Sequence, residues 1–507
     1  MTTPDPAAVV TDQTREGRLW RAAVLVTWLA TLVRLLFAIR LPLFPDETYY
    51  WDWSRHLAGG YFDHPPMIAL LIAAGPGVRF WSVVAGGVAG LATSAIARRL
   101  GGGAAAVRAA VVLAVMPLVA SGLVLATPDA PLLAASAVGL YCVVRAVQAP
   151  LRSRAALGWW SAAGVALGLA FASKYTSILL PVTATAAVLL RPSLRARLRE
   201  PGPYVACVLA TLVFLPVLHW NATHDWISFR FQVQHGLGTP KGSALKRELD
   251  LIGGQLGLVS PILFALAADS VWRTLRRPVD DARFLLAVVA VGSWVFFVYS
   301  ATRRAVEPNW PAPSYVPGVA LLAALATTPG YQRWLRRGVA LAAVMVGVLY
   351  LHALTPILPI PARRDPLARN EGWAGLALAV RTAAQERKLS PAVVHVGADR
   401  YQDVSELAYH LTDAEPVNVD CICLRGRHNQ YELWPRFAQV ARPGDALVLA
   451  LDEREGVHET AAALAPYFTT VTRGALAPLL RGADTVTTRR IWILEGYRGG
   501  WPLRAEP

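Results

Sequence analysis

The sequence predicts a polytopic helical membrane protein that ends in a small α/β domain. Charged residues make up only 16% of the 507 residues, whereas about 25% is usual in soluble domains. Long apolar stretches recur between residues 22 and 355, and after residue 361 the apolar runs shrink to the length of strands. So few charges cannot cover the surface of a soluble protein of this size, and a chain this apolar does not stay unfolded in water.

About eleven apolar stretches are long enough to cross the roughly 30 Å of hydrocarbon in a bilayer. They cover residues 22–39, 80–97, 109–126, 130–148, 157–173, 175–190, 203–219, 251–272, 284–300, 313–329 and 338–355. Residues 1–21 are polar, and no small-residue cleavage site of the A-x-A kind follows the first stretch. We therefore expect an uncleaved first span behind a short cytoplasmic tail.

Arginine supplies nearly all of the positive charge, and its positions predict the orientation of the spans. The formal net charge is +15, and arginine clusters precede the first span and follow the second, fourth, sixth, eighth and tenth. Cytoplasmic loops are enriched in Lys and Arg, so we expect a cytoplasmic N-terminus in a bacterial inner membrane. An odd number of spans then places everything after residue 355 outside. No nucleic-acid partner is expected, because it would require one contiguous basic face.

The predicted outer loops differ from the arginine-rich inner loops, because polar and aromatic residues gather in them. These loops cover residues 40–79, 126–130, 220–250 and 300–312. We therefore expect chemistry on the outer face of the membrane domain, residues 22–355, and above all in the long first loop.

Residues 361–507 predict a separate α/β domain, which the span count places outside the membrane. Strand-length apolar runs cover residues 392–397, 416–420, 446–451 and 490–496, with helical patterns at 373–386 and 405–411. No G-x-G-x-x-G follows a strand, so no nucleotide is expected. The four cysteines of the chain do not form the pattern of a disulfide framework. Cys421, Cys423 and His428 lack a fourth metal ligand of suitable spacing.

The strongest chemical signal is a pair of acids, Asp46 and Glu47, directly after the first span. Charged side chains next to a membrane span are energetically costly, so their presence indicates a function. Asp63 and His64 follow in the same loop, before two prolines that stop helix formation. The alternative interpretation is an interfacial loop whose acids face water and whose aromatic residues form a belt at the membrane surface.

Isolated charges mark the shorter outer segments. Asp129 lies in ATPDA and Lys174 lies in ASKYT, each between two spans. Asp129 could instead cap the following helix, and Lys174 could either bind an anion or extend to the membrane interface. The last outer loop carries Arg303 and Arg304, whose guanidinium forks match phosphate oxygens. Anionic lipid headgroups are the alternative partner for this pair.

The first outer loop, PDETYYWDWSRHLAGGYFDHPPM, resembles that of lipid-linked-sugar glycosyltransferases with the GT-C fold. It is most similar to bacterial members of glycosyltransferase family 39 and to the aminoarabinose transferases that act on lipid A. The resemblance continues through TPDAPLL, ASKYT, HWNATHDWISF, EPNWPAPSY and DRYQDVSELAYHL, and so covers most of the chain. It implies an inverting transferase that uses a polyprenyl-phosphate sugar on the extracytoplasmic face.

The resemblance also implies roles for individual residues. Asp46 matches the catalytic base. Positions expected to contact the acceptor or the sugar are Glu47, Asp63, His64 and Asp129. Positions expected to bind the donor phosphate are Lys174, Arg303 and Arg304, with Glu307, Asn309 and Trp310 beside them. The His-Pro-Pro and Glu-Pro-Asn-Trp sequences depart from the aminoarabinose transferases, which leaves the donated sugar open.

The chemistry is consistent with these residue types. A polyprenyl phosphate is a good leaving group, so the acceptor hydroxyl needs a base but the donor needs no general acid, and cations would stabilise the departing phosphate. No cofactor is required, although paired acids leave a divalent metal open. The expected partners are the lipid-linked donor, membrane lipid and an unspecified envelope lipid, polymer or protein acceptor. The alternative functions are a transporter or flippase of lipid-linked sugars, and a polytopic scaffold without catalysis.

Overall fold

The computed structural model describes residues 6–240, 242–390, 393–412, 418–424, 427–453 and 457–502. The chain divides into two compact units. The larger unit comprises Met1–Arg40 and Leu57–His352, and the smaller unit comprises Leu41–His56 and Ala353–Pro507. The boundary between the two units at His352 and Ala353 lies close to the predicted boundary after residue 355. The first part of the predicted catalytic loop, however, belongs to the smaller unit.

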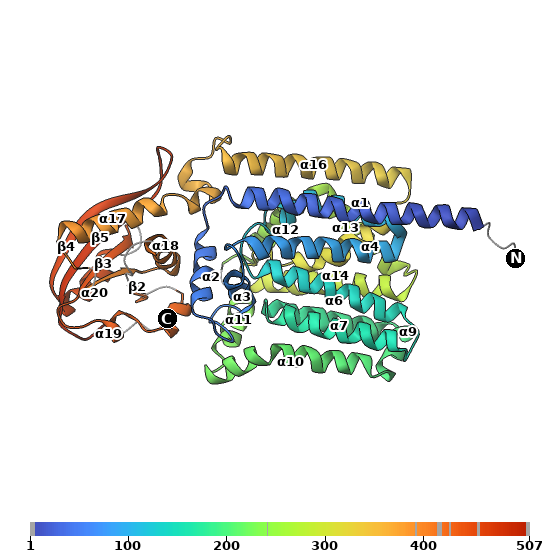
Figure 1. The fold of residues 1–507 in the computed structure, drawn as a ribbon, viewed down its shortest axis with the longest axis horizontal. Helices are drawn as coiled ribbons and strands as arrows, with labels where there is room; N and C mark the ends of the chain where they lie inside the picture. The colour runs from blue at the N-terminus through green and yellow to red at the C-terminus, as the bar shows by residue number, and fades with distance from the viewer. Residues whose placement is uncertain are drawn as a thin grey trace. The chain divides into compact units, whose positions relative to one another are not determined.

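The larger unit is a helical bundle in which the long helices lie side by side (Figure 1). Helix α1 packs on α4, and the packing continues through α6, α7 and α10. The helices of this unit are α1 (Pro6–Ala38), α3 (Met67–Ala73), α4 (Phe80–Val115), α5 (Pro117–Ala120), α6 (Asp129–Gln148), α7 (Arg154–Phe171), α8 (Leu179–Leu190), α9 (Pro192–Arg195), α10 (Gly202–Thr223), α11 (Ile227–Leu237), α12 (Ala244–Val259), α13 (Pro261–Arg276), α14 (Asp281–Arg303), α15 (Tyr315–Leu325) and α16 (Pro329–Leu354). Single 3-10 turns are η1 (Tyr175–Ile178), η2 (Ala196–Arg199) and η3 (Ala312–Ser314).

Small residues allow these helices to approach closely, as is usual for helix pairs in membranes. A Cβ atom added to Gly87 of α4 would lie 2.8 Å from Oγ1 of Thr31 in α1. One added to Gly164 of α7 would lie 2.4 Å from the carbonyl oxygen of Ala206 in α10. At Gly164 the facing backbone leaves no room for a Cβ atom, and at Gly87 side chains of α1 occupy that space.

The described part of the chain contains six helices that are long and apolar enough to cross a membrane, or up to eight if two bent pairs are counted. The chain is thus a multi-pass membrane protein, and each predicted span overlaps a helix. The predicted span 80–97 lies within α4, which is kinked at Gly101 and Gly102, and the predicted span 109–126 begins in the part of α4 after this kink. The count of eleven spans and the orientation stay predictions.

One detail of the span prediction is wrong. Residues 251–272 do not form one helix, because α12 and α13 meet at Ser260 with a bend of 104°. Ser260 has φ +76°, which an α-helix cannot accommodate, and Pro261 lacks the N–H that would continue the helix. Helix α1 begins within the predicted N-terminal tail, at Pro6, and is continuous through the first predicted span.

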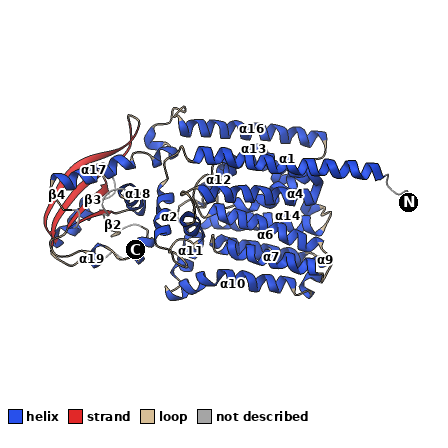
Figure 2. Cartoon of the chain, in the orientation of Figure 1, coloured by secondary structure: helices blue, strands red, loops and turns tan. Residues whose placement is uncertain are grey.

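The smaller unit contains a five-stranded sheet of order β2-β1-β3-β5-β4 (Figure 2). Strands β1, β2 and β3 are parallel, whereas β5 is antiparallel to β3 and forms a hairpin with β4. The strands are β1 (Val394–Ala398), β2 (Asn418–Cys421), β3 (Ala446–Asp452), β4 (Phe468–Arg481) and β5 (Asp484–Tyr497). The α/β prediction is confirmed, but β4 was not predicted, because a half-exposed hairpin strand containing Gly474 and Pro478 has no continuous apolar run.

Helices of the smaller unit pack against this sheet and against each other. They are α2 (Pro45–Arg55), α17 (Trp373–Glu386), α18 (Tyr401–Leu411), α19 (Phe437–Val440) and α20 (Val457–Leu464), with the turns η4 (Ala362–Arg364), η5 (Pro366–Asn370), η7 (Gln430–Leu433) and η8 (Ala465–Tyr467). Helix α17 contacts α18, and α18 contacts both the sheet and α2. Cys421 and Cys423 form a disulfide with Cα atoms 5.2 Å apart, which the lack of a framework pattern in the sequence did not predict. A spacing of two residues matched no expected framework.

Candidate active site

The two neighbouring acids at the start of α2 have different environments. Pro45 occupies the first position of the helix, where its missing N–H costs nothing. Glu47 is fully buried, and its carboxylate accepts the backbone N–H of Phe44 at 3.0 Å, so it satisfies an amide at the helix start. Asp46 is solvent-exposed. Of the pair, Asp46 is therefore the acid that a substrate can reach.

Helix α18 holds the start of α2 through hydroxyl groups. The Tyr401 hydroxyl donates a hydrogen bond to Oδ1 of Asp46 at 2.9 Å. The Ser405 hydroxyl donates to the carbonyl oxygen of Pro45 at 3.0 Å, and the Thr48 hydroxyl donates to Ser405 at 3.0 Å. These contacts fix both the backbone and the carboxylate of Asp46.

The environment of Asp46 suits a base. Surrounding protein withholds water from the carboxyl and raises its pKa above the ordinary value, although the residue keeps a solvent-accessible face. The hydrogen bond from Tyr401 and the positive charges of Arg427 and Arg369 oppose this rise in pKa. A carboxylate whose pKa is moved towards neutrality is a stronger base than an ordinary aspartate.

An acid of α18, Glu406, also lies close to the start of α2 but is buried. Glu406 is 1% exposed, and burial together with the charges of Glu47 and Asp403 raises its pKa well above the ordinary value. Nε2 of His410 lies 3.5 Å from its carboxylate. Glu406 lies in the DRYQDVSELAYHL segment, but neither it nor Tyr401 was predicted as a site residue. The available signal was the stretch 401–406, which holds two acids and two hydroxyl-bearing residues.

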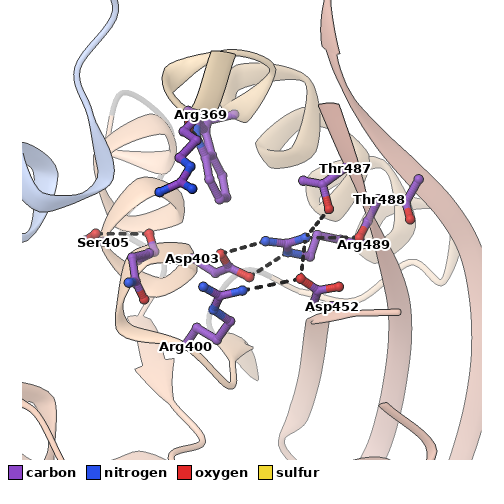
Figure 3. A network of polar contacts seen from close by, with 10 residues as sticks. Arg369, Arg400, Asp403, Ser405, Asp452, Thr487, Thr488 and Arg489 are labelled. Atoms are coloured by element: carbon purple, nitrogen blue, oxygen red, sulfur yellow. Dashed lines mark hydrogen bonds and ion pairs between the residues drawn. The ribbon is translucent and has the colours of Figure 1, made fainter. Parts of the chain in front are cut away.

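A buried ion network fixes α18 to the sheet (Figure 3). Arg489 of β5 binds Asp403 through two hydrogen bonds, of 2.6 Å from Nε and 3.0 Å from Nη2. Its Nη1 also lies 3.2 Å from Oδ2 of Asp452 in β3, which Arg400 contacts at 3.4 Å. Paired and hydrogen-bonded in this way, buried charges hold a defined geometry. The network therefore positions the first turn of α18, which carries Tyr401.

The larger unit contains a separate polar cluster built from predicted residues. Nζ of Lys174 donates to Oδ1 of Asp129 at 2.8 Å, and Nδ2 of Asn309 donates to Oδ2 of the same carboxylate at 3.0 Å. Lys174 also lies 6.0 Å from the ring centre of Trp310, which packs on His235. The structure thus brings four predicted residues together from three distant segments. Lys174 and Asp129 are both buried, so neither simply extends into solvent.

The loop with Asp63 and His64 is held mainly through its backbone. The carbonyl oxygen of Asp63 accepts a hydrogen bond from Nε2 of Gln232 at 2.5 Å. The carbonyl oxygen of His64 accepts the backbone N–H of Tyr61 at 3.1 Å. Asp63 itself is 3% exposed. The loop is therefore fixed against α11, which contributes Gln232.

The two arginines at the end of α14 differ in their contacts. Nε of Arg303 donates to the carbonyl oxygen of Leu237 at 2.9 Å, so this side chain ties α14 to the end of α11. Nε of Arg304 is buried and makes no hydrogen bond with any described residue. Glu307 is exposed, and its carbonyl oxygen accepts the backbone N–H of Trp310 at 3.0 Å. The described residues contain no group of three side chains suited to a metal ion.

Comparisons with known proteins agree with this architecture. Residues 63–220 match the family model described as dolichyl-phosphate-mannose-protein mannosyltransferase. The structure of ArnT from Cupriavidus metallidurans bound to undecaprenyl phosphate superimposes with a TM-score of 0.62 and covers 92% of this chain and 97% of that one, at 19% identity. The chain has the GT-C fold. This confirms the fold expected from the first outer loop.

Two further proteins are similar. Lipid A galacturonosyltransferase RgtD from Rhizobium johnstonii is 28% identical over 384 residues, which cover 73% of this GT-C chain and 78% of that protein. The oligosaccharyltransferase AglB from Archaeoglobus fulgidus, in complex with an inhibitory peptide and a dolichol phosphate, has a TM-score of 0.50 at 12% identity and covers 87% of this chain and 71% of that one. These relatives support glycosyltransferase activity and give no support to a transporter.

Proposed function

We propose that the protein is an inverting glycosyltransferase that moves a hexuronic acid, such as galacturonic acid, from a polyprenyl phosphate to an acceptor hydroxyl. The observation that carries this proposal is the exposed carboxylate of Asp46, held at the start of α2 by the Tyr401 hydroxyl. The name of the similar Rhizobium protein supports the sugar. The undecaprenyl phosphate in the similar Cupriavidus structure supports the carrier.

In the proposed reaction Asp46 takes the proton from the acceptor hydroxyl as its oxygen attacks the anomeric carbon. The bond between that carbon and the carrier phosphate breaks, and its electron pair leaves with the phosphate. Because attack and departure occur on opposite faces of the sugar, the anomeric configuration inverts. The polyprenyl phosphate leaves without protonation.

Cations of the larger unit are proposed to stabilise the departing phosphate. Arg304 is favoured over Arg303, because the Nε of Arg303 already binds a carbonyl oxygen whereas that of Arg304 has no partner among the described residues. Lys174 is the other candidate, with Asp129 and Asn309 fixing its ammonium group. In this proposal Asp129 affects the substrate only by positioning the ammonium group of Lys174.

The reaction is proposed to take place on the extracytoplasmic face of a bacterial inner membrane, with the N-terminus in the cytoplasm. Alternating arginine clusters support this orientation. The disulfide between Cys421 and Cys423 also supports it, because disulfides persist in oxidising compartments.

The test is sugar transfer by purified Asp46→Asn protein in liposomes, with undecaprenyl-phosphate galacturonic acid as donor and lipid A as acceptor. Loss of a general base costs roughly a hundredfold or more in rate, and we expect a loss of this order. Asp484→Asn is a matched control, because Asp484 is an exposed acid at the β4–β5 turn of the same unit. Turnover by Asp46→Asn at the control rate would refute Asp46 as the base.

A further inference from the structure

Two arginines of the smaller unit place positive charge near Asp46. Arg369 lies in η5 and Arg427 lies just before η7, and the positive charges of both lower the pKa of Asp46. Neither residue was predicted as part of the site. Cations beside a base weaken it, so their presence next to Asp46 requires another explanation.

The segments that carry these arginines are each tied to the segment around Asp46. Nδ2 of Asn370, the residue after Arg369, donates to the carbonyl oxygen of Pro42 at 3.1 Å. The backbone N–H of Gln430 donates to the Tyr49 hydroxyl at 2.7 Å. Pro42 precedes Asp46 by four residues and Tyr49 follows it by three. Both arginines are therefore anchored close to the start of α2.

Arg427 is also oriented by its own contacts. Its guanidinium carbon lies 5.0 Å from the ring centre of Tyr401, the residue whose hydroxyl binds Asp46. Asn429, two residues after Arg427, is tied to the Cys421–Cys423 disulfide, because its Nδ2 lies 3.3 Å from Sγ of Cys423. Arg427 therefore lies on the Tyr401 side of Asp46.

Arg369 differs from the arginines of this unit that form ion pairs with acids. Arg489, Arg481 and Arg490 are each paired with carboxylates, whereas the exposed Arg369 guanidinium forms no hydrogen bond or ion pair with a described residue. Figure 3 shows its guanidinium directed towards α18, on the side where Ser405 lies. Its five donors are available to a ligand.

We propose that Arg369 and Arg427 form a subsite beside Asp46 that binds an oxyanion of the substrate. Guanidinium forks bind carboxylate and phosphate oxygens in bidentate geometry. This inference rests on the proposed role of Asp46 as the base. Because the acceptor attacks from the side of the base, the carrier phosphate departs from the opposite face of the sugar. The oxyanion is therefore either the carboxylate of a uronic acid donor or an acidic group of the acceptor.

The test measures equilibrium binding to full-length protein in nanodiscs, in the Asp46→Asn background so that no turnover is needed. The donor pair is undecaprenyl-phosphate galacturonic acid and undecaprenyl-phosphate galactose, and the acceptor pair is lipid A with and without its phosphates. Charge-assisted hydrogen bonds predict a preference of roughly tenfold to a hundredfold for the anionic member of one pair. Preference within the donor pair identifies the sugar carboxylate, and preference within the acceptor pair identifies the acceptor phosphate.

Arg369→Ala and Arg427→Ala should abolish this preference and leave binding of the neutral member unchanged. Arg369→Lys should keep part of it, because the charge remains but the fork is lost. Arg364→Ala, at an exposed arginine of η4, is the control and should keep it whole. The proposal is overturned if neither pair is discriminated, or if Arg369→Ala leaves the discrimination intact. Failure of Asp46 as the base would appear separately, as turnover by the single Asp46→Asn variant.

Discussion

Removal of the Tyr401 hydroxyl tests how the smaller unit supports the proposed base. In Tyr401→Phe the ring remains, so its contacts with Arg427 and with Tyr49 are preserved. The 2.9 Å hydrogen bond from the Tyr401 hydroxyl to Asp46 is lost. The variant therefore separates the orientation and acidity of Asp46 from the packing of α18.

The expected loss follows from the type of hydrogen bond. Bonds to charged groups contribute roughly 1.5–3 kcal/mol, and the exposed face of Asp46 argues for the lower end. A loss of about 1.5 kcal/mol corresponds to roughly tenfold in kcat/KM. The direction of the pH effect is also fixed. Tyr401 lowers the pKa of Asp46, so its removal raises that pKa and moves the acid limb of the rate profile to higher pH.

The assay is kcat/KM for sugar transfer measured from acidic to neutral pH. Tyr467→Phe is the control, because the Tyr467 hydroxyl makes no hydrogen bond with a described residue of the same unit. A tenfold loss with an unshifted acid limb would show that Tyr401 acts on packing alone. Wild-type kcat/KM with a wild-type profile would refute the reasoning entirely.

Three further predictions concern stability. Lys174→Met leaves the buried Asp129 carboxylate without its cation and should lower the unfolding free energy in detergent by about 3–5 kcal/mol, whereas an unchanged thermal midpoint would contradict the ion pair. Arg489→Met should destabilise the smaller unit by a similar roughly 3–5 kcal/mol, because Asp403 stays buried; proteolysis of that unit at the wild-type rate would be the contrary result. Burial and the neighbouring Asp403 raise the pKa of Asp399 to about 7. Folded Asp399 therefore retains a proton that the unfolded chain releases, stability falls as pH rises towards that value, and Asp399→Asn should flatten this dependence in denaturant titrations.

Much of the fold could be predicted because apolar stretches and charge clusters are patterns that extend over many residues of the sequence. The helical spans follow from apolar length, and α17 is predicted at residues 373–386, where the structure has it. The break at Ser260 could not be predicted from apolar length, which continues through it, and the local signal was Pro261, which lacks the N–H that would continue α12. Strand β4 was missed because it is stabilised by pairing with β5, and its own composition does not indicate that pairing.

The site could be predicted only where a residue is chemically conspicuous in its segment. Asp129 and Lys174 stand out as rare charges among apolar spans, and the structure joins them. Tyr401, Arg369 and Arg427 are ordinary residues of a polar domain. Tyr401 matters through a contact with a helix more than 300 residues earlier in the chain, because its 2.9 Å bond to Asp46 spans 355 positions. The segments of Arg369 and Arg427 are likewise tied to residues near Asp46. No local pattern encodes such a pairing.

The membership of α2 in the smaller unit has a consequence for biosynthesis. Chains are made from the N-terminus and fold as their segments emerge, yet Thr48 binds Ser405, which is synthesised 357 residues later. During most of translation α2 therefore lacks the helix that orients its carboxylate. A nascent or truncated chain could insert all of its spans and still lack the contacts that hold the proposed base. Catalytic competence would then be acquired last, only when the final strands have folded and α18 has docked.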